Sequence, residues 1–501
     1  MIKLVAINEV LKEKISGEWG VDAEKGPETK VIRTANFLNN GKINFKNIVM
    51  RNIPKAKVEK KKLIDGDVII EKSGGSPIQP VGRVVYFMNP DSATYLCNNF
   101  TSILRPDPKM ITGKYLFYAL FYNHKTSKTL SFQNKTTGII NLKLESYLQT
   151  KILLPPLEDQ IRIAKVLGRL EGFIARRKES LRLLDEFLKS TFLEMFGDPI
   201  RNQKGWKVKK LIEVVSLASG GTPSKTNQGY WQGKIPWVSP KDMKTLFISD
   251  SIDHISAEAA TQLKMIPVNS ILVVVRGLIL VHHIPFALTR VAITINQDMK
   301  ALQLKNEDYD PIFLLFFLII SENNLLKKVS TAAHGTKRLD TTNLENFLVI
   351  FPPFLLQRKF SEIARKVEEL KASYLKNLEE LEALFGSLSQ LAFKGELDVS
   401  NVPLEENEMI PSEIHVEAAD TTEKEIIKAD FSEAAILAAL RKSESKTLSF
   451  GSLFIKLQND ETAEIADYEK TKQTIFSLLR KKILSQSFDE NKKEMVLNLE
   501  K

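Results

Sequence analysis

Pro155-Pro156-Leu157-Glu158-Asp159-Gln160 begins a stretch that the chain uses twice. The second copy reads Pro352-Pro353-Phe354-Leu355-Leu356-Gln357. Each copy runs into a long helical pattern, which ends near Gly197 in the first case and near Gly395 in the second. Each also follows a globular segment, so the order is globule, helix, globule, helix and tail. Because a repeat fixes the architecture before any single element does, this duplication decides the fold.

Proline and glycine mark the ends of the first helix. Pro156 suits a first helical position, where its missing N–H costs no hydrogen bond, and Gly197 and Pro199 suit a helix end. The globular segments mix short strand-like runs with helices, and residues 425–501 read as three helical runs before a hairpin. We therefore predict an α/β protein in which a long antiparallel two-helix coiled coil separates two mixed α/β domains, with a small C-terminal winged-helix-like domain.

The predicted boundaries follow these signals. An acidic stretch without Lys or Arg between 401 and 423 reads as a linker. A shift of 204 residues places Lys72-Ser73 on Arg276-Gly277, so the two domains read as divergent copies of one fold. The predicted segments are a first domain at 1–153, the first helix at 154–197, a second domain at 198–351, the second helix at 352–396, the linker at 397–424 and the C-terminal unit at 425–501.

Both helical stretches carry an apolar stripe at alternating four- and three-residue steps, which is the heptad pattern of a coiled coil. Such a stripe also suits packing against a neighbouring domain. Two matched stripes at matched places nevertheless favour helices that pack on each other. The middle of the predicted seam consists of Leu170, Ile174, Arg177 and Leu181 in the first helix and Leu370, Tyr374, Asn377 and Leu381 in the second.

Two polar residues in the seam predict its direction. Arg177 is the midpoint of the seam from 163 to 191, and Asn377 is the midpoint of the seam from 363 to 391. Midpoints meet in an antiparallel pair, where the guanidinium can donate to the Asn carbonyl and so lower the cost of burying either group. The alternative is that both side chains point to solvent.

Composition narrows the class of protein. The chain has 501 residues, 43% of them hydrophobic, and a net charge of +10 that favours a polyanionic partner. Cys97 is the only cysteine, which excludes an intrachain disulfide and a cysteine-based zinc cluster. The first residues lack the features of a signal peptide, and the longest apolar run, 312–320, suits a buried helix. We expect a soluble cytoplasmic protein.

The sequence lacks the residues that common catalytic chemistries need. It contains no phosphate-binding G-x-x-x-x-G-K-[ST] loop and no H-E-x-x-H metal motif. His282 and His283 are adjacent, so on a strand they point to opposite faces and cannot share a metal ion. The two Pro-Pro pairs lack the polar residue that precedes them in adenine methyltransferases. We expect no catalytic residues, no metal site and no bound cofactor in this chain.

One combination of motifs is specific. Gly220-Gly221-Thr222-Pro223 stands before Tyr230-Trp231-x-Gly233-x-Ile235-Pro236-Trp237, and both helices begin with Pro-Pro-x-x-x-Gln. This combination resembles the specificity (S) subunit of type I restriction-modification enzymes, over about residues 1–400. The first domain departs from the pattern, since Ser16-Gly17 stands where the second has Gly220-Gly221.

The resemblance implies a function. Each domain would be a target-recognition domain for one half of a bipartite, asymmetric DNA site, and the coiled coil would set the spacing. Two methyltransferase (M) subunits would dock on this core, and motor-nuclease (R) subunits would complete the complex. S-adenosylmethionine, ATP and Mg would belong to those partners. A seam of 28 residues spans about 42 Å, similar to about 12 base pairs.

Candidate DNA contacts follow from position in the matched segments. Hydroxyl, lysine and arginine side chains hold phosphates, and arginine also binds base edges. For each Arg and Lys the alternative is a solvated surface charge. The candidates are Lys72, Ser73, Arg83, Lys135 and Thr136 in the first domain and Thr222, Ser224, Lys225, Lys241, Arg276, Lys337 and Arg338 in the second.

Two other functions remain open at this point. The chain could be a single-chain nuclease or methyltransferase with unrecognised motifs, or a decayed scaffold that binds no DNA. The DNA target cannot be derived from the sequence, because recognition depends on loop conformation and DNA shape as well as residue type.

Overall fold

The computed structural model describes residues 3–22, 28–76, 79–136, 139–331 and 335–404, together with short stretches between 436 and 499. It divides into two compact units, residues 1–410 and 411–501. No helix in these described ranges is long and apolar enough to cross a membrane.

The second unit shows one antiparallel sheet. Its strands are β26 (Thr447–Ser449), β27 (Leu484–Asp489) and β28 (Glu494–Leu499), in the order β26-β28-β27. The predicted hairpin is confirmed, because Asp489 pairs with Glu494. Most of the three predicted helical runs and the predicted linker beyond residue 404 lie outside the described residues. The described part therefore does not support the winged-helix assignment.

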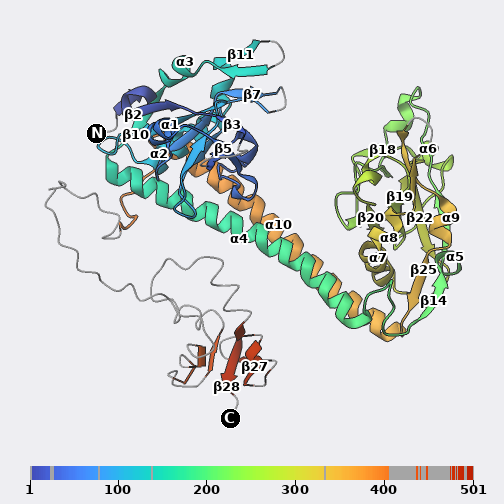
Figure 1. The fold of residues 1–501 in the computed structure, drawn as a ribbon. Helices are drawn as coiled ribbons and strands as arrows, with labels where there is room; N and C mark the ends of the chain where they lie inside the picture. Colours follow the sequence, from blue (N-terminus) through green and yellow to red (C-terminus); the bar gives the residue numbers. More distant parts are fainter. Residues whose placement is uncertain are drawn as a thin grey trace. The chain divides into compact units, whose positions relative to one another are not determined.

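In the first domain, helix α2 packs against a four-stranded antiparallel sheet (Figure 1). The strand order of this sheet is β2-β10-β6-β8. β1 closes the domain by pairing with β13, with Lys3 opposite Leu154. The bounds are β1 Lys3–Ala6, β2 Leu11–Ser16, β3 Val21–Asp22, β4 Glu28–Ile32, β5 Val49–Asn52, α1 Lys55–Lys61, β6 Val68–Glu71, β7 Ser73–Gly75, β8 Val84–Tyr86, β9 Tyr95–Cys97, β10 Thr101–Pro106, α2 Gly113–Lys125, β11 Gln133–Thr136, β12 Ile139–Leu142, α3 Leu144–Leu148 and β13 Lys151–Leu154.

The second domain repeats this topology. Its main sheet has the order β15-β22-β19-β20-β17, and β14 pairs with β25 as β1 pairs with β13. The bounds are β14 Lys207–Lys210, α5 Leu211–Val214, β15 Val215–Ser219, β16 Ile235–Val238, β17 Phe247–Ile248, β18 Asp253–Ile255, α6 Ala257–Thr261, β19 Ile271–Val274, η6 Leu278–Val281, β20 Phe286–Thr289, β21 Thr294–Ile295, β22 Met299–Leu304, α7 Pro311–Ile320, α8 Glu322–Leu326, β23 Val329–Thr331, β24 Lys337–Leu339, α9 Thr341–Glu345 and β25 Leu348–Phe351. The prediction of two divergent copies of one fold is confirmed.

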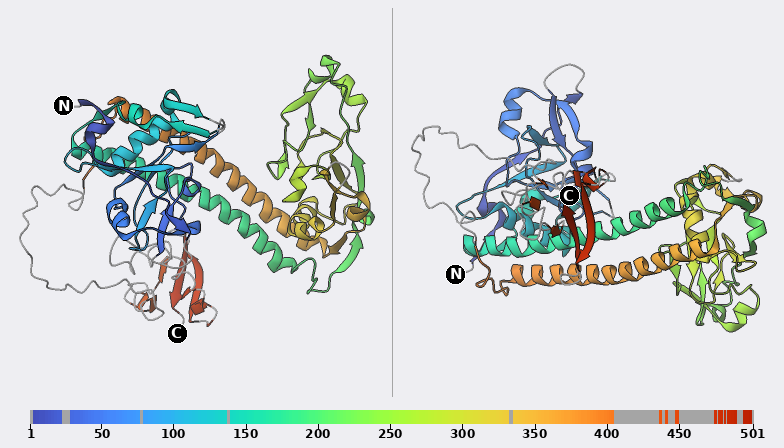
Figure 2. Two further views of the ribbon diagram at one scale, coloured as in Figure 1. Left: turned by 45° about the horizontal axis from the view of Figure 1, so that its top comes forward. Right: turned by 90° about the horizontal axis from the view of Figure 1, so that it is seen from below.

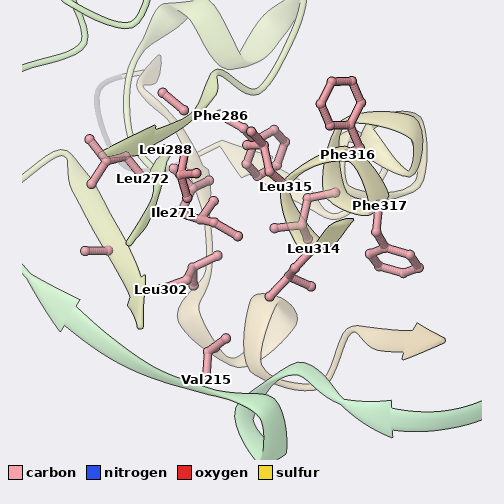
Figure 3. Packing of buried hydrophobic residues seen from close by; sticks show 14 of the residues in the cluster. Val215, Ile271, Leu272, Phe286, Leu288, Leu302, Leu314, Leu315, Phe316 and Phe317 are labelled. Carbon is pink, nitrogen blue, oxygen red and sulfur yellow. The ribbon is translucent and has the colours of Figure 1, made fainter. Parts of the chain in front are cut away.

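The apolar run of the second domain forms the buried helix α7, as predicted. Asp310 caps it by accepting a hydrogen bond from the backbone N–H of Ile312. Figure 3 shows Leu314 and Leu315 of α7 facing Ile271 and Leu302 of the sheet. This core fixes the sheet from which the loops of the domain project.

The two long helices lie side by side and run in opposite directions (Figure 2). α4 spans Leu157–Phe196 and α10 spans Phe354–Lys394. Lys178 Nζ lies 2.7 Å from Glu382 Oε1, and Lys371 Nζ lies 2.8 Å from Asp185 Oδ1. Partner numbers fall along α10 as they rise along α4, so the pair is antiparallel.

The midpoints of the helices meet with a different contact from the one predicted. Arg177 and Asn377 line the same small groove. The guanidinium, however, lies over the ring of Tyr374, 4.0 Å from its centroid, which is a cation–π contact. We find no hydrogen bond between Arg177 and Asn377 in the described residues.

The predicted seam of α10 needs a correction at Leu370. That side chain is 40% exposed, whereas Lys371 next to it is only 14% exposed. Lys371 also bonds Glu368 at 2.8 Å, so two carboxylates neutralise it. A lysine that reaches paired carboxylates can occupy a seam position that hydrophobic periodicity alone gives to a leucine.

Each domain packs on an opposite end of the helix pair. In the first domain, the cluster of buried residues includes Leu167 near the start of α4 and Ala392 near the end of α10. In the second, Phe192 of α4 stacks on Phe313 of α7 and meets Phe360 of α10 edge-on. The helix pair therefore holds the two domains apart.

Residues 397–402, which follow α10, return to the first domain. Val399 is buried in that domain's core, and Arg162 donates from Nε to the backbone oxygen of Val402 at 3.1 Å. Leu397 and Val399 line a cavity of about 40 Å³ with Leu153. The end of α10 is thus fastened beside the start of α4.

A buried glutamine locks the start of each long helix onto its domain. Gln160 Oε1 accepts from the backbone N–H of Thr112 at 2.8 Å, and Nε2 donates to the oxygens of Met110 and Pro155, both at 2.9 Å. Thr112 is the N-cap of α2, so the glutamine joins α4 to α2.

The second copy makes the equivalent set of bonds. Gln357 Oε1 accepts from the backbone N–H of Asp310 at 2.9 Å, and Nε2 donates to the oxygens of Asp308 at 3.2 Å and Pro352 at 2.9 Å. Both glutamine side chains are fully buried. The Gln of the Pro-Pro-x-x-x-Gln motif therefore sets the angle between helix and domain.

We predict that Gln357→Ala lowers the free energy of unfolding by about 3 kcal/mol, because buried backbone groups lose their partners. Gln390→Ala, at an exposed position of the same helix, should change it by less than about 0.5 kcal/mol. Chemical denaturation measured by circular dichroism compares the two. Equal effects would contradict the role of Gln357.

Candidate nucleic-acid interface

One edge of the main sheet in the second domain gathers most of the predicted contacts. β15 and β19 are both antiparallel to β22, so they run parallel to each other and end at the same edge. β22 and β20 begin at that edge. The segments 219–226, 275–285 and 296–298 therefore lie next to one another, because the ends of neighbouring strands meet.

Glycines allow the first of these segments to pass close to another backbone. A Cβ on Gly220 would lie 2.0 Å from the oxygen of Ile295, so no other residue fits without a shift. The N–H of Gly221 donates to that same oxygen at 2.9 Å, and Trp237 Nε1 donates to the oxygen of Gly221 at 2.9 Å. The conspicuous Gly-Gly and Pro-Trp motifs thus shape this loop.

The side chains beyond the glycines remain at the surface. The hydroxyl of Thr222 donates to Gln297, from the segment before β22. Ser224, Lys225 and Lys241 are exposed, and the Ser224 hydroxyl lies 2.8 Å from that of Thr226. This arrangement leaves hydroxyl and ammonium groups available to an incoming polyanion.

The cations at this edge come from two chain segments. Arg276 follows β19 and forms a β-bridge with Arg338 of β24. Arg276 Nη1 lies 3.9 Å from Asp298 Oδ1, and Arg338 Nε lies 3.0 Å from Asp340 Oδ1. Lys337 Nζ donates to the Thr331 hydroxyl at 2.7 Å. Arg276 and Arg338 therefore lie side by side although they are distant in sequence, and Lys337 precedes Arg338 on β24.

The equivalent edge of the first domain requires a corrected alignment. The N–H groups of Lys72 and Ser73 both donate to the oxygen of Phe100, as those of Val275 and Arg276 donate to the oxygen of Asp298. Ser73 therefore corresponds to Arg276, a shift of 203 rather than 204. The same shift places Gly17 on Gly220, because the N–H of Glu18 donates to the oxygen of Cys97 as that of Gly221 donates to the oxygen of Ile295. The first domain therefore keeps this glycine.

The first-domain candidates lie at this edge with less exposure. Lys72 Nζ donates to the Ser16 hydroxyl at 2.6 Å, and burial lowers the pKa of this lysine. The Ser73 hydroxyl donates to Asn141 Oδ1 at 2.6 Å. Lys135 and Thr136 belong to β11, whose backbone alone is described at these residues.

Arg83 is a correction. Its side chain is 12% exposed and makes two 2.8 Å hydrogen bonds to the buried carboxylate of Glu71. It also donates to the backbone oxygens of Thr34 and Phe37. Because all of these acceptors lie inside the domain, we assign Arg83 to the core and withdraw it as a DNA contact. Sequence position alone could not distinguish a buried ion pair from a surface cation.

Sequence reasoning also missed residues at the interface. Gln297 Oε1 accepts a hydrogen bond from the Thr222 hydroxyl, and Lys300 Nζ donates to the Ser219 hydroxyl at 3.0 Å. The polar run Asn296-Gln297-Asp298 between two strands was the available signal.

Comparison with known proteins identifies the family. A sequence profile described as "Type I restriction modification DNA specificity domain" matches residues 16–183 and 203–383. The chain belongs to this family. The two matches include the two domains with most of the long helices, so each domain is a target-recognition domain of a type I specificity subunit.

Similar proteins carry the same description. The chain is 30% identical over 277 residues to the EcoR124I/EcoR124II specificity subunit of Escherichia coli, covering 53% of this chain and 65% of that one, just under two thirds. It is 25% identical to the MjaIX specificity subunit of Methanocaldococcus jannaschii, covering 64% and 77%. The crystal structure of an S subunit from M. genitalium shares the fold, with a TM-score of 0.50, 15% identity and coverage of 78% and 96%.

The chain belongs to the specificity subunits, which are not themselves catalytic. Among the described residues, no group of three or more His, Cys, Asp or Glu is placed to hold a metal ion. His282 and His283 are both exposed, on the segment that follows β19. The candidate interface presents hydroxyl, amide and cationic groups at its surface.

We predict that Arg83→Ala lowers the free energy of unfolding by about 3–5 kcal/mol, because it leaves the Glu71 carboxylate buried and unpaired. Arg83→Ala with Glu71→Leu should recover part of this loss. Thermal unfolding of the variants measures both effects. A single variant with wild-type stability but weakened DNA binding would return Arg83 to the interface.

Proposed function

We propose that this protein is the DNA-recognition subunit of a type I restriction-modification complex, in which each domain binds one half of a bipartite, asymmetric site. The observation that carries the proposal is the duplicated sheet edge. In the second domain this edge combines Thr222, Ser224 and Lys225 with Arg276, Lys337 and Arg338. Lys241 is exposed in the same domain. Such a mixture of phosphate-binding and base-reading groups suits duplex DNA.

Different side chains at equivalent positions make the proposed site asymmetric. Ser73 stands where the second domain has Arg276, and Asn141 stands where it has Arg338, since the two members of each pair bridge in the same way. A serine and an asparagine offer different hydrogen bonds to base edges from two arginines. The two domains would therefore bind different sequences.

Apolar side chains on the helix pair support docking of partner subunits. Phe173, Leu183 and Phe187 of α4 are 50%, 43% and 49% exposed, and Leu375 and Leu384 of α10 are 48% and 44% exposed. Exposed aliphatic and aromatic residues along long helices suit contact with helices of another chain. We assign these surfaces to two methyltransferase subunits, which would carry S-adenosylmethionine. Motor-nuclease subunits would supply ATP- and Mg-dependent steps.

The first test of this function uses the intact complex. The chain is co-expressed with a type I methyltransferase subunit, and methylated adenines are mapped by sequencing genomic DNA. We expect one bipartite motif with a fixed spacer. Methylation by the methyltransferase subunit alone at the same motif, or nuclease or methyltransferase activity of this purified chain alone, would reject the proposal.

We predict that the double variant Lys225→Ala, Lys241→Ala reduces the slope of log affinity against log salt by about 2, since each lost phosphate contact removes about 0.9. The preference for the mapped site over a scrambled site should stay unchanged. Fluorescence anisotropy with both duplexes over a salt series measures these quantities. An unchanged slope would show that neither lysine contacts phosphate.

Arg276 and Lys337 are tested in the same way. A variant that loses half-site discrimination identifies a base contact, and one that loses only salt dependence identifies a phosphate contact. The matched control is Lys264→Ala, an exposed lysine of the same domain. Unchanged binding by both Arg276→Ala and Lys337→Ala would remove these residues from the interface.

We also predict that the helix pair determines the spacer. Removing seven residues from the middle of each helix shortens it by about 10.5 Å, or about three base pairs, while keeping the heptad phase. The mapped motif should keep both half-sites and lose about three spacer base pairs. Seven residues removed from α4 alone should instead disrupt assembly. A shortened pair that methylates the original motif would contradict a spacing role.

A further inference from the structure

A small apolar projection stands within the proposed DNA interface. The 3₁₀ helix η6 follows Arg276 and Gly277 and exposes Leu278 by 73%, Ile279 by 37% and Val281 by 52%. Burying these side chains would be favourable, at about 25 cal/mol for each Å² removed from water. None of the roles assigned so far uses them.

The projection is held in place by the domain. Leu280 is buried in the core between its exposed neighbours. Before it, the N–H of Gly277 donates to the oxygen of Lys337 at 3.0 Å. After it, the N–H of Ile284 donates to the Glu322 side chain at 2.6 Å. Gly277 adopts a φ of 137°, which favours glycine. A projection anchored on both sides loses little conformational entropy when it binds.

Its surroundings carry the charges that suit a polyanion. Arg276 precedes the projection by two residues, and Arg338 and Lys337 belong to β24, which packs against η6. Asp298 and Asp340 offset the charges of the two arginines. Lys337, which donates to the Thr331 hydroxyl, therefore supplies the net positive charge of this group. His282 and His283 follow directly and are exposed. A protein partner with an apolar surface would not need cations on the same edge, whereas DNA phosphates do.

We propose that Leu278, Ile279 and Val281 enter a groove of the duplex and make apolar contacts with the bases of the half-site bound by the second domain. The proposal rests on the DNA-recognition function above and adds specificity-determining residues to it. Aliphatic side chains discriminate among bases in two ways, by contacting the methyl group of thymine or by inserting between base pairs at a flexible step. Both are apolar base contacts, and the DNA probes below distinguish them.

The test compares Leu278→Ala with Val268→Ala in the full-length chain bound to its methyltransferase subunits. Val268 is 47% exposed in the segment before β19, at the opposite edge of the sheet. Anisotropy is measured with a duplex carrying the mapped motif and with one whose second half-site is scrambled. We expect Leu278→Ala to weaken binding to the mapped motif by about tenfold. Binding to the scrambled duplex, the salt slope and the thermal midpoint should stay at wild-type values, as should all properties of Val268→Ala.

Modified duplexes then identify the contact. If deoxyuridine in place of thymidine in the second half-site weakens wild-type binding but leaves Leu278→Ala unaffected, the contact is with a thymine methyl group. If 2-aminopurine in that half-site brightens on binding of the wild type but not of Leu278→Ala, the contact is insertion between base pairs.

Other results overturn the inference. Wild-type discrimination by Leu278→Ala would exclude a base contact. Intact DNA binding with weakened assembly would assign the projection to a methyltransferase subunit instead. A wild-type complex that fails to prefer the mapped duplex over the scrambled one would count against the proposed function itself, so the two failures are distinguishable.

Discussion

The arrangement of this molecule depends on the angle at which each domain leaves the helix pair. Two buried glutamines, Gln160 and Gln357, set that angle with three hydrogen bonds each. In both copies the side chain joins the first turn of a long helix to the N-terminal end of the domain's main helix. Since none of these amide groups is accessible to water, any rotation of the domain would break several hydrogen bonds at once. The edges that carry the candidate interface are therefore held in a fixed relation to the helices.

The helix pair also fixes a length, the distance between the two domains. Its contacts are both apolar and ionic, and the ion pairs of Lys178 and Lys371 specify direction and register in a way that leucines alone would not. Because each domain packs on only one end of the pair, the middle of the pair sets the distance between the domains without taking part in either core. The proposed roles in recognition and in spacing thus fall to different parts of one chain.

The sequence allowed the architecture to be predicted because duplication and helical periodicity are both linear patterns. The two domains, the two long helices and their antiparallel pairing could be predicted in this way. Finer assignments needed the structure. Lys371 takes the seam position expected for Leu370, since its ammonium reaches two carboxylates. Arg83 turns inward to Glu71, and the bridge between Arg276 and Arg338 joins residues from separate strands. Such contacts depend on three-dimensional neighbours that no spacing rule contains.

The return of residues 397–402 to the first domain has a consequence for the order of the chain. In the second domain, the chain passes without interruption from the end of α4 to β14. In the first, residues 397–402 come back from the end of α10 to the place where β1 pairs with β13. Residues 397–402 and β1 therefore both lie beside the start of α4, at the place that corresponds to the connection between α4 and β14 in the second domain. The contacts within the fold do not determine which domain comes first in the sequence. A gene permuted to begin at the second domain would therefore encode the same contacts.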